Sequence, residues 1–243
     1  MAKIQLSSGH NEGRGAGGPG IYQNINRRSE ADEEGGAGMT ITPEEWALVK
    51  DPGLIFMKNA IIGKAVALFA GLTAEMTARW ELQRWPPPLT EWVPAIGRMG
   101  PKISRGENYQ GLPWVVMDHP RLFGKTDVFA VRTLFWWGHY FSVTLHLKGV
   151  YKERWLTVIQ GNIPLLAGAG YHVCISQDEW RHELAADNYC PLTGTSPEKI
   201  AAICEEAAFL KFSAVVPLAE WNVAHEQILR LYEVLLQSLT THY

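Results

Sequence analysis

The sequence predicts an α+β domain: a mainly antiparallel sheet, built around a central β-hairpin and packed by N- and C-terminal amphipathic helices. The first observation is residues 127–148, two runs of β-branched and aromatic residues that meet at Gly138-His139. Such an arrangement is a strong short-range signal of a hairpin. The second observation is that strand and helix patterns do not alternate regularly along the chain, which disfavours a doubly wound parallel sheet.

Length and composition narrow the class of protein. The chain has 243 residues, of which 47% are hydrophobic and 19% charged, enough for one well-packed core. Its formal net charge is −3 and it has no Lys/Arg-rich block, so nucleic-acid binding is disfavoured. Its three cysteines lack a C-x-x-C spacing, so they support neither a disulfide framework nor a cysteine-rich zinc site. Because the N-terminus has no apolar signal region, we expect a cytoplasmic protein.

Residues 1–38 are expected to form a flexible extension. Their nine glycines and few large apolar groups cannot offset the entropic cost of ordering. The glycines at 13, 15 and 18 match the dinucleotide-binding fingerprint in spacing only, because no strand precedes them and no helix follows. We expect residues 39–243 to form a single α+β domain, and the extension to be either a fused peptide or a segment that a protein partner recognises.

The domain is expected to begin with helices. Residues 42–45, Thr-Pro-Glu-Glu, supply a capping hydroxyl, a proline at the first helical position and a glutamate at the third. Apolar residues then recur at helical spacing over 55–80, which predicts a long amphipathic helix that ends before the prolines at 86–88. Polar side chains within residues 54–72 make this helix too polar for an ordinary bilayer span, so no membrane association is expected.

The remaining elements follow from turn residues and hydrophobic period. A polar loop over 102–109 leads into a strand over 112–118, which Pro120 closes. After the hairpin we expect, in order, a helix over 150–160, a strand over 169–176, a helix over 176–186 with Ser176 as its N-cap, a helix over 197–207, a strand over 209–216 and a terminal helix over 218–239.

A two-residue loop at Gly138-His139 would pair Trp137 with Tyr140 and sort the hairpin into two faces. One face is apolar apart from Arg132 and carries Val128, Ala130, Leu134, Trp136, Phe141, Val143, Leu145 and Leu147. The other face is mixed and carries Phe129, Val131, Thr133, Phe135, Trp137, Tyr140, Ser142, Thr144, His146 and Lys148. Small-molecule pockets are lined by apolar walls with a few placed polar groups, so the mixed face is the candidate binding surface.

The candidate ligand-binding residues come from two places. The mixed face supplies Thr133, Phe135, Trp137, Tyr140, Thr144 and His146, and the polar loop supplies Lys102, Arg105, Glu107, Asn108 and Tyr109. The hydroxyls and the imidazole would form hydrogen bonds, and the aromatic rings would form walls. Either Lys102 or Arg105 would provide the counter-charge for an anionic group. Two glycines beside the loop would let its backbone approach a ligand closely.

Arg132 has two explanations. A buried guanidinium requires a carboxylate, because an unpaired buried charge is costly. A structural ion pair with an acid such as Asp118 or Glu107 satisfies this requirement. An anion-binding arginine at the mouth of a pocket is the other explanation.

A metal site is the alternative to a simple binding surface. Glu179 and His182 are three residues apart on an expected helix and could share Fe or Zn with His146 or His172. Such a site could activate water or dioxygen at an open coordination position. The sequence fixes no third ligand, and neither H-E-x-x-H nor G-x-S-x-G occurs, so no catalytic residues are assigned.

Four stretches of the sequence resemble a family of small uncharacterised bacterial proteins: KISRGENYQGLPWVVMDHPRLF, VFAVRTLFWWGHYFSVTLHLKG, CISQDEW and FLKFSAVVPLAEW. The resemblance covers residues 42–239 and implies a single cytoplasmic domain without an assigned activity. Three functions therefore stay open. They are an accessory domain that binds a small polar-aromatic ligand or a peptide segment, a metal-dependent enzyme, and a partner subunit whose extension another enzyme recognises.

Overall fold

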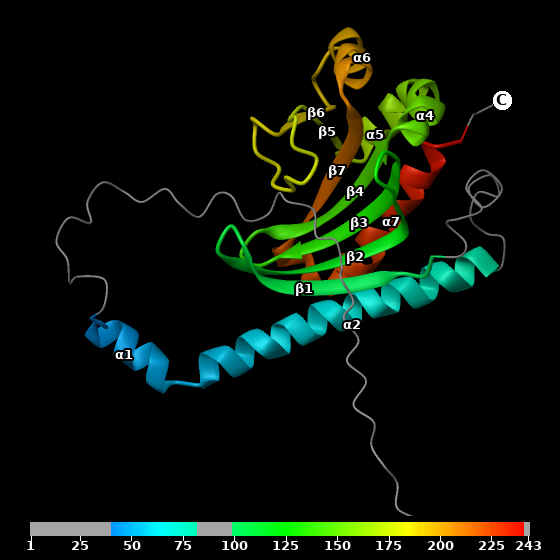
Figure 1. Ribbon diagram of the computed structural model, residues 1–243. Coiled ribbons are helices and arrows are strands. Elements are labelled where there is room, and N and C mark those ends of the chain that lie inside the picture. Colours follow the sequence, from blue (N-terminus) through cyan, green and yellow to red (C-terminus); the bar gives the residue numbers. More distant parts are fainter. Residues whose placement is uncertain (1–39, 82–98, 241–243) are drawn as a thin grey trace, which may run out of the picture.

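The computed structural model describes residues 40–81 and 99–240. Three expectations lie outside these residues: the flexible extension over 1–38, the proline-rich end of the first long helix and most of the linker after it. Within the described residues the predicted fold class is confirmed. Seven strands form one antiparallel sheet in the order β1-β2-β3-β4-β7-β5-β6, and helices pack against it (Figure 1).

The described elements have the following bounds. The strands are β1 (Lys102–Tyr109), β2 (Leu112–Phe123), β3 (Val128–Trp136), β4 (Tyr140–Lys148), β5 (His172–Cys174), β6 (Tyr189–Pro191) and β7 (Phe209–Pro217). The α-helices are α1 (Pro43–Lys50), α2 (Gly53–Glu81), α4 (Val150–Gly161), α5 (Ile163–Gly168), α6 (Pro197–Glu206) and α7 (Ala224–Gln237). A 3-10 helix, η3 (Leu218–Val223), links β7 to α7.

The predicted hairpin is formed by β3 and β4, but its register differs from the prediction by one residue. Trp136, not Trp137, pairs with Tyr140, because the loop contains three residues rather than two. Gly138 takes a positive φ of 77° in this loop, and the His139 amide donates to the Trp136 carbonyl at 3.1 Å. A glycine in the left-handed region is typical of three-residue hairpin loops.

Because of this shift, the side chains of β4 lie on the faces that were predicted for them, whereas those of β3 lie on the opposite faces. A one-residue slip exchanges the two faces of a strand relative to its neighbour. Phe129, Val131, Thr133 and Phe135 therefore share the core side with the apolar residues of β4. Arg132 lies on the opposite side, where Thr144 is its partner on β4.

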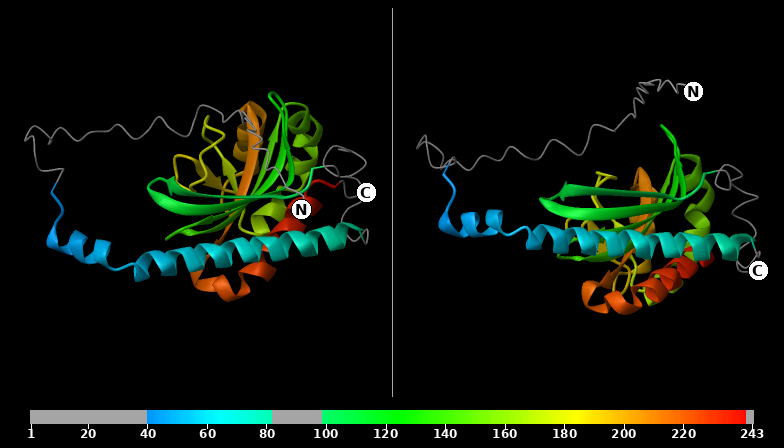
Figure 2. Two further views of the ribbon diagram at one scale, coloured as in Figure 1. Left: turned by 60° about the horizontal axis from the view of Figure 1, so that its bottom comes forward. Right: turned by 90° about the horizontal axis from the view of Figure 1, so that it is seen from below.

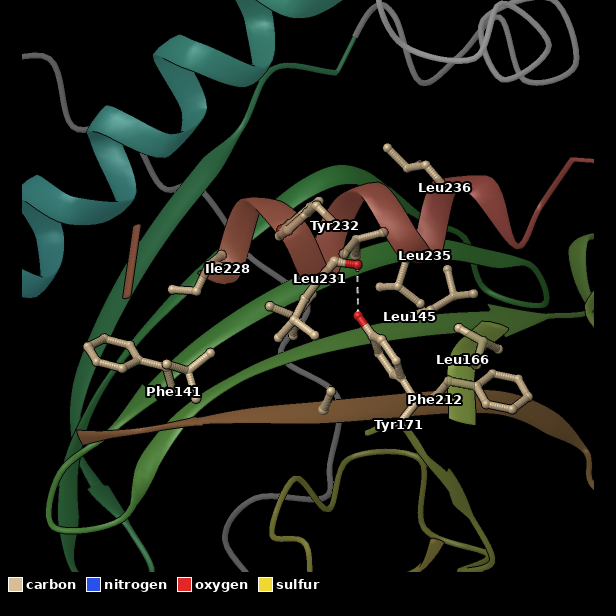
Figure 3. Close-up of a cluster of buried hydrophobic side chains, with 14 of the residues drawn as sticks. Phe141, Leu145, Leu166, Tyr171, Phe212, Ile228, Leu231, Tyr232, Leu235 and Leu236 are labelled. Carbon is tan, nitrogen blue, oxygen red and sulfur yellow. Dashed lines mark hydrogen bonds between the residues drawn. The ribbon is translucent and has the colours of Figure 1, made fainter. Parts of the chain in front are cut away.

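The hydrophobic core fills the space between the sheet and helices α2 and α7 (Figures 2 and 3). The apolar side chains of α7, among them Ile228, Leu231 and Leu235, face the sheet (Figure 3). Three buried hydroxyl groups are satisfied there. Tyr171 donates to the Leu231 carbonyl at 2.9 Å, and the hydroxyls of Tyr232 and Thr133 lie 2.9 Å apart. Thr133 is therefore part of the core.

Two strands differ from the sequence-based expectation. Residues 102–109 form strand β1 rather than a loop, and β1 pairs with β2 at the edge of the sheet. Strand β2 does not stop at Pro120. It continues across a bulge between Asp118 and Arg121, which is a position where a sheet tolerates proline.

The helix predicted over 176–186 is wrong. Residues 175–188 instead form an irregular segment, here called the lid loop, which packs on the sheet. The Ser176 hydroxyl accepts from the Asp178 amide at 3.1 Å, and the Asp178 carboxylate accepts from the Trp180 amide at 2.9 Å. Side chains that bind backbone donors two residues ahead compete with helix formation, which explains the failure of the N-cap prediction.

Helix α2 docks on the sheet through a single apolar stripe, formed by Ile62, Ala65, Phe69, Leu72 and Met76. By length and composition, Gly53–Arg79 is apolar enough to cross a bilayer, contrary to the expectation from its polar side chains. Its most apolar 18-residue window has a mean hydropathy of 1.5, and 17% of that window is buried. The docked stripe nevertheless ties the later part of α2 to the core.

Candidate functional site

The candidate site lies on the face of the sheet turned away from α2 and α7, here called the polar face. One row of polar residues crosses five neighbouring strands and consists of Asp118, Arg132, Thr144, Ser213 and His172. Paired residues in an antiparallel ladder point to the same side of the sheet, so the register alone gathers these groups. The next row holds His146 opposite Lys211.

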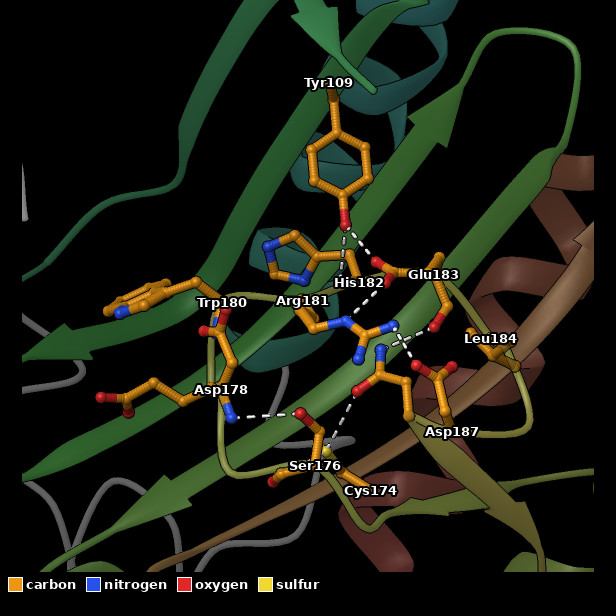
Figure 4. A network of polar contacts seen from close by, with 12 residues as sticks. Tyr109, Cys174, Ser176, Asp178, Trp180, Arg181, His182, Glu183, Leu184 and Asp187 are labelled. Atoms are coloured by element: carbon orange, nitrogen blue, oxygen red, sulfur yellow. Dashed lines mark hydrogen bonds and ion pairs between the residues drawn. The ribbon is translucent and has the colours of Figure 1, made fainter. Parts of the chain in front are cut away.

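The lid loop covers the polar face (Figure 4). It is held through its backbone and through the side chains of Glu179, His182 and Glu183. Four hydrogen bonds join side chains of the sheet to the backbone of the loop. Lys211 donates to the carbonyls of Glu179 and Arg181, at 2.9 and 2.7 Å. The hydroxyls of Tyr109 and Tyr140 accept from the amides of His182 and Leu184, both at 2.8 Å. The Tyr109 hydroxyl also donates to the Glu183 carboxylate at 2.6 Å. The loop is thus closed over the site by contacts from β1, β4 and β7.

Arg132 pairs with Asp118, as one of its two explanations predicted. The guanidinium donates to both carboxylate oxygens, at 2.7 and 3.0 Å, in a bidentate arrangement. A third guanidinium nitrogen lies 3.0 Å from His182 Nε2. Because arginine can only donate, Nε2 must accept, and a neutral His182 carries its proton on Nδ1. Burial, together with this nearby charge, lowers the pKa of His182 well below 6.5.

His146 and Glu179 meet beneath the lid loop without a well-formed hydrogen bond. The Nε2 and Oε2 atoms lie 3.1 Å apart, yet neither atom makes a hydrogen bond of good geometry. Lys148 contacts the other carboxylate oxygen at 2.7 Å. The nearby His146 and Lys148 lower the pKa of Glu179 to about 2, whereas burial lowers the pKa of His146. The carboxylate is therefore ionised and the imidazole neutral at pH 7.

Lys211 is the most buried cation of the site, with 1% of its surface exposed. Its ammonium contacts two backbone carbonyls of the lid loop and lies 5.7 Å from the centre of the Tyr189 ring. Among the described residues, no carboxylate lies within ion-pair distance of it. Burial lowers the pKa of Lys211 from 10.5 to about 8, so the group is still a cation at neutral pH.

A small pocket opens beside the first residues of the lid loop. Its volume is about 130 Å³, and it is lined by Cys174, Ile175, Ser176, Gln177, Ile203, Glu206, Ala207 and Ala208. Cys174 belongs to β5 and its pKa is raised by burial, which keeps the thiol protonated. The pocket lies where the lid loop leaves the sheet.

The buried histidines predict acid sensitivity. Burial lowers the folded-state pKa values of His182, His146 and His119, the last to about 4, whereas the unfolded chain takes up these protons near 6.5. Between these pH values the unfolded state binds more protons than the folded state. The free energy of unfolding therefore has its highest value above pH 6.5 and falls as the pH drops toward about 4. Urea unfolding over this range measures the fall.

The matched variants are His182→Gln, which keeps an acceptor for Arg132 but cannot titrate, and His139→Gln in the exposed hairpin loop. We expect the first to reduce the pH dependence, with His146 and His119 still contributing, and the second to leave it unchanged. A urea midpoint that stays constant over this pH range would contradict the assignment.

The residues predicted to bind a ligand separate into three groups. Those that border the site are Tyr109, Tyr140, Thr144 and His146. Those that belong to or pack on the core are Thr133, Phe135 and Trp137, which corrects their assignment to the mixed face. Those exposed on the edge strand β1 are Lys102, Arg105, Glu107 and Asn108, where Glu107 pairs with Lys58 at 2.7 Å.

Gly106 is one of the two glycines expected to let a ligand approach the backbone, but the structure gives another reason for a glycine at this position. A Cβ atom at Gly106 would lie 2.5 Å from the Trp114 ring, so the missing side chain makes room for tryptophan. Trp136, on the same face of the sheet, packs against the Tyr109 ring with centroids 5.2 Å apart and stacks on His139 at 3.6 Å. The aromatic side chains at this end of the hairpin therefore pack largely on one another.

The alternative metal ligands do not form a coordination sphere. Among residues 40–81 and 99–240, no group of three or more His, Cys, Asp or Glu side chains is placed to hold a metal ion. His182 is engaged by Arg132, and His172 lies 3.1 Å from the Gly170 carbonyl through Nδ1. The structure thus brings His146 and Glu179 together, but leaves His172 and His182 in other contacts.

Comparison with known proteins adds no relative. No family model matches the chain, and a search of curated proteins returns no match. The case for function therefore depends on the geometry of the polar face.

Sequence reasoning missed Lys211, Ser213 and Trp180 as site residues. A lysine inside the apolar strand FLKFSAVV was the available signal for Lys211, because an apolar strand rarely carries an ammonium without a specific contact. Trp180 packs its ring 6.0 Å from that of His146 at the edge of the site. Only the course of the lid loop, which the sequence did not reveal, brings it there.

Proposed function

We propose that the protein is a non-catalytic binding domain whose polar face holds a small ligand that carries an anionic group beside an aromatic one. The observation that carries the proposal is Lys211, a buried ammonium without a carboxylate partner among the described residues. Buried charges are normally paired, because an uncompensated one is costly. A ligand carboxylate or phosphate would supply the missing counter-charge.

The neighbouring groups support this assignment. Thr144 and Ser213 place two hydroxyls 2.8 Å apart in the row beside Lys211, and the hydroxyl that accepts in this pair keeps its own proton to donate to an anion. Trp180 offers an apolar wall, with 37% of its surface exposed. Buried groups with perturbed pKa values gather here, which is typical of functional sites.

The lid loop would have to move for a ligand to reach Lys211. The two carbonyls that now receive the ammonium belong to the loop itself, so a ligand anion would replace them. The pocket beside Ser176 and Gln177 provides a space into which the loop can shift. An exchange of a neutral dipole for a full negative charge favours the ligand, because hydrogen bonds to ionised acceptors are stronger.

Binding of benzoate tests the proposal, with inorganic phosphate as a second probe. Each is titrated into the full chain while His182 and Trp180 ring signals are followed by NMR. We expect Lys211→Met to weaken binding by at least about tenfold, since a charge-assisted hydrogen bond contributes roughly 1.5–3 kcal/mol. The matched control is Lys102→Met, which removes an exposed lysine from β1 and should leave binding unchanged.

The two probes separate the ligand classes. Tighter binding of benzoate than of phosphate would support an aromatic carboxylate, and the reverse order a phosphate. No binding of either anion, or binding that Lys211→Met leaves intact, would contradict the proposal.

A peptide segment is the second candidate ligand, and one observation favours it. The polar face already binds the extended lid loop through backbone carbonyls and amides, the groups that any peptide presents. A synthetic peptide with the sequence of residues 175–188 would then compete with the lid loop. Faster amide hydrogen exchange in the lid loop on adding this peptide is the expected result, and unchanged exchange would exclude it.

A further inference from the structure

Exposed apolar side chains concentrate at one end of the described chain. Residues 41–57, here called the helical arm, comprise α1 and the first turn of α2. Eight of the fourteen large apolar residues exposed among the described residues belong to it: Ile41, Trp46, Leu48, Val49, Leu54, Ile55, Phe56 and Met57. Contiguous exposed apolar surface of this kind marks an interaction site.

The helical arm does not pack on the part of the domain that the structure describes. The first buried residue of α2 is Ile62, and α1 has no buried residue. Figures 1 and 2 show the start of α2 reaching past the edge of the sheet, with α1 beyond it and bent from the axis of α2 in Figure 1. Lys58 pairs with Glu107 of β1 at 2.7 Å and marks the last attachment of α2 to the sheet before the arm. The apolar residues of the arm thus lie beyond the domain.

The exposed residues surround the helix rather than lining one side of it. Residues 54–57 are four consecutive positions, each more than half exposed, at 52–69%. Successive residues of an α-helix are about 100° apart, so four of them cover its whole circumference. A protein partner on one side would leave the opposite side in water. A helix that is apolar all round belongs in a core or in lipid.

We infer that the helical arm inserts into the interfacial region of a lipid bilayer and attaches the domain to a membrane surface. The apolar start of α2 supports this, since residues 54–57 are all large, apolar and more than half exposed. Trp46, with Lys50 4.9 Å from its ring, is suited to the boundary between headgroups and hydrocarbon. This assignment replaces the expectation of no membrane association.

The arm attaches the domain without spanning the bilayer. The part of α2 before Ile62 has nine residues, which extend about 13 Å at 1.5 Å per residue. A hydrocarbon core is about 30 Å thick. The rest of α2 is held in the protein core by its buried stripe, so it cannot enter the lipid without unfolding the domain.

The charge of the helical arm sets which lipids favour its binding. Residues 41–57 carry three acidic groups, Glu44, Glu45 and Asp51, and one basic group, Lys50. The arm therefore has a formal net charge of −2, and anionic lipid does not attract it. Binding should then depend on apolar burial and should be weakened by anionic headgroups.

Flotation of the full chain with phosphatidylcholine vesicles tests the inference. We expect the unmodified chain to float with the vesicles, and to a lesser extent when part of the lipid is phosphatidylglycerol. The double variant Ile55→Gln/Phe56→Gln should lower the partition coefficient by at least about tenfold, because two large apolar side chains leave the lipid. Both positions are exposed, so the fold should persist, which far-UV circular dichroism checks.

The matched control is Val150→Gln/Val223→Gln, which removes two exposed valines outside the arm and should float like the unmodified chain. Failure of the unmodified chain to float would overturn the inference, and so would flotation that survives the arm substitutions. Dimers that disappear in the arm variant, with no vesicle binding by either chain, would assign the arm to a second copy instead. Neither result depends on the ligand proposed for the polar face.

Discussion

Asp118→Val is expected to lower the free energy of unfolding by about 3–5 kcal/mol, the cost of leaving one partner of a buried ion pair alone. Asp118 is 6% exposed, and the side chain of Arg132 is 19% exposed. The two share bidentate contacts between β2 and β3. Removing the carboxylate leaves a guanidinium with only His182 as a partner in this contact. Urea unfolding monitored by tryptophan fluorescence gives the change.

A double-mutant cycle separates the pair from its parts. Arg132→Met alone should also destabilise, because it leaves a buried carboxylate. The combined variant, Asp118→Val/Arg132→Met, should cost less than either single change, since an apolar pair can replace a buried ion pair at little cost. If the losses of unfolding free energy in the two single variants add up in the double variant, the two side chains do not interact, which would contradict the contact between them.

Phe69→Ala is expected to lower the free energy of unfolding by about 3–5 kcal/mol, whereas Phe56→Ala on the same helix should change it by less than about 0.5 kcal/mol. Phe69 is fully buried and meets the edge of the Phe141 ring at 6.3 Å. Phe56 is 69% exposed in the helical arm. The two variants remove the same atoms from one helix, so burial alone decides the difference.

The same two variants separate the stability of the domain from its binding to vesicles. Phe69→Ala weakens the docking of α2 on the sheet, while Phe56→Ala should weaken only the binding of vesicles. Urea unfolding measures the first effect and flotation the second. Equal losses of stability in both variants would show that the arm packs against the domain and is not free to enter a bilayer.

Local patterns predicted the fold class and most of the elements. The runs of β-branched and aromatic residues at 128–136 and 140–148 are strands, and the helix starts at Thr42 and Ser196 have capping side chains. The register was beyond local information, because Gly138 fits either a two-residue or a three-residue loop. Packing of the β3 side chains against the core decides between them.

The site was less predictable than the fold. Tyr140, Thr144 and His146 were named from the mixed face of β4, whose assignment is right. Lys211 and the lid loop are far from them in sequence, and only the pairing of β4 with β7 brings Lys211 beside His146. The sequence at the start of the lid loop is typical of a helix N-terminus. Two of its amides instead donate to the hydroxyls of Tyr109 and Tyr140, and these long-range contacts cannot be predicted from a local pattern.

The attachment of residues 175–188 through carbonyls and amides has a consequence for sequence variation. Main-chain groups are common to all residues except for the amide that proline lacks, so many substitutions at Leu184 would preserve the bond from its amide to Tyr140. Homologues of this protein can therefore diverge at the positions of this segment that are held through the main chain alone, and a randomised library at such positions would yield many folded members. Lys211 and the two tyrosines, by contrast, have no such freedom.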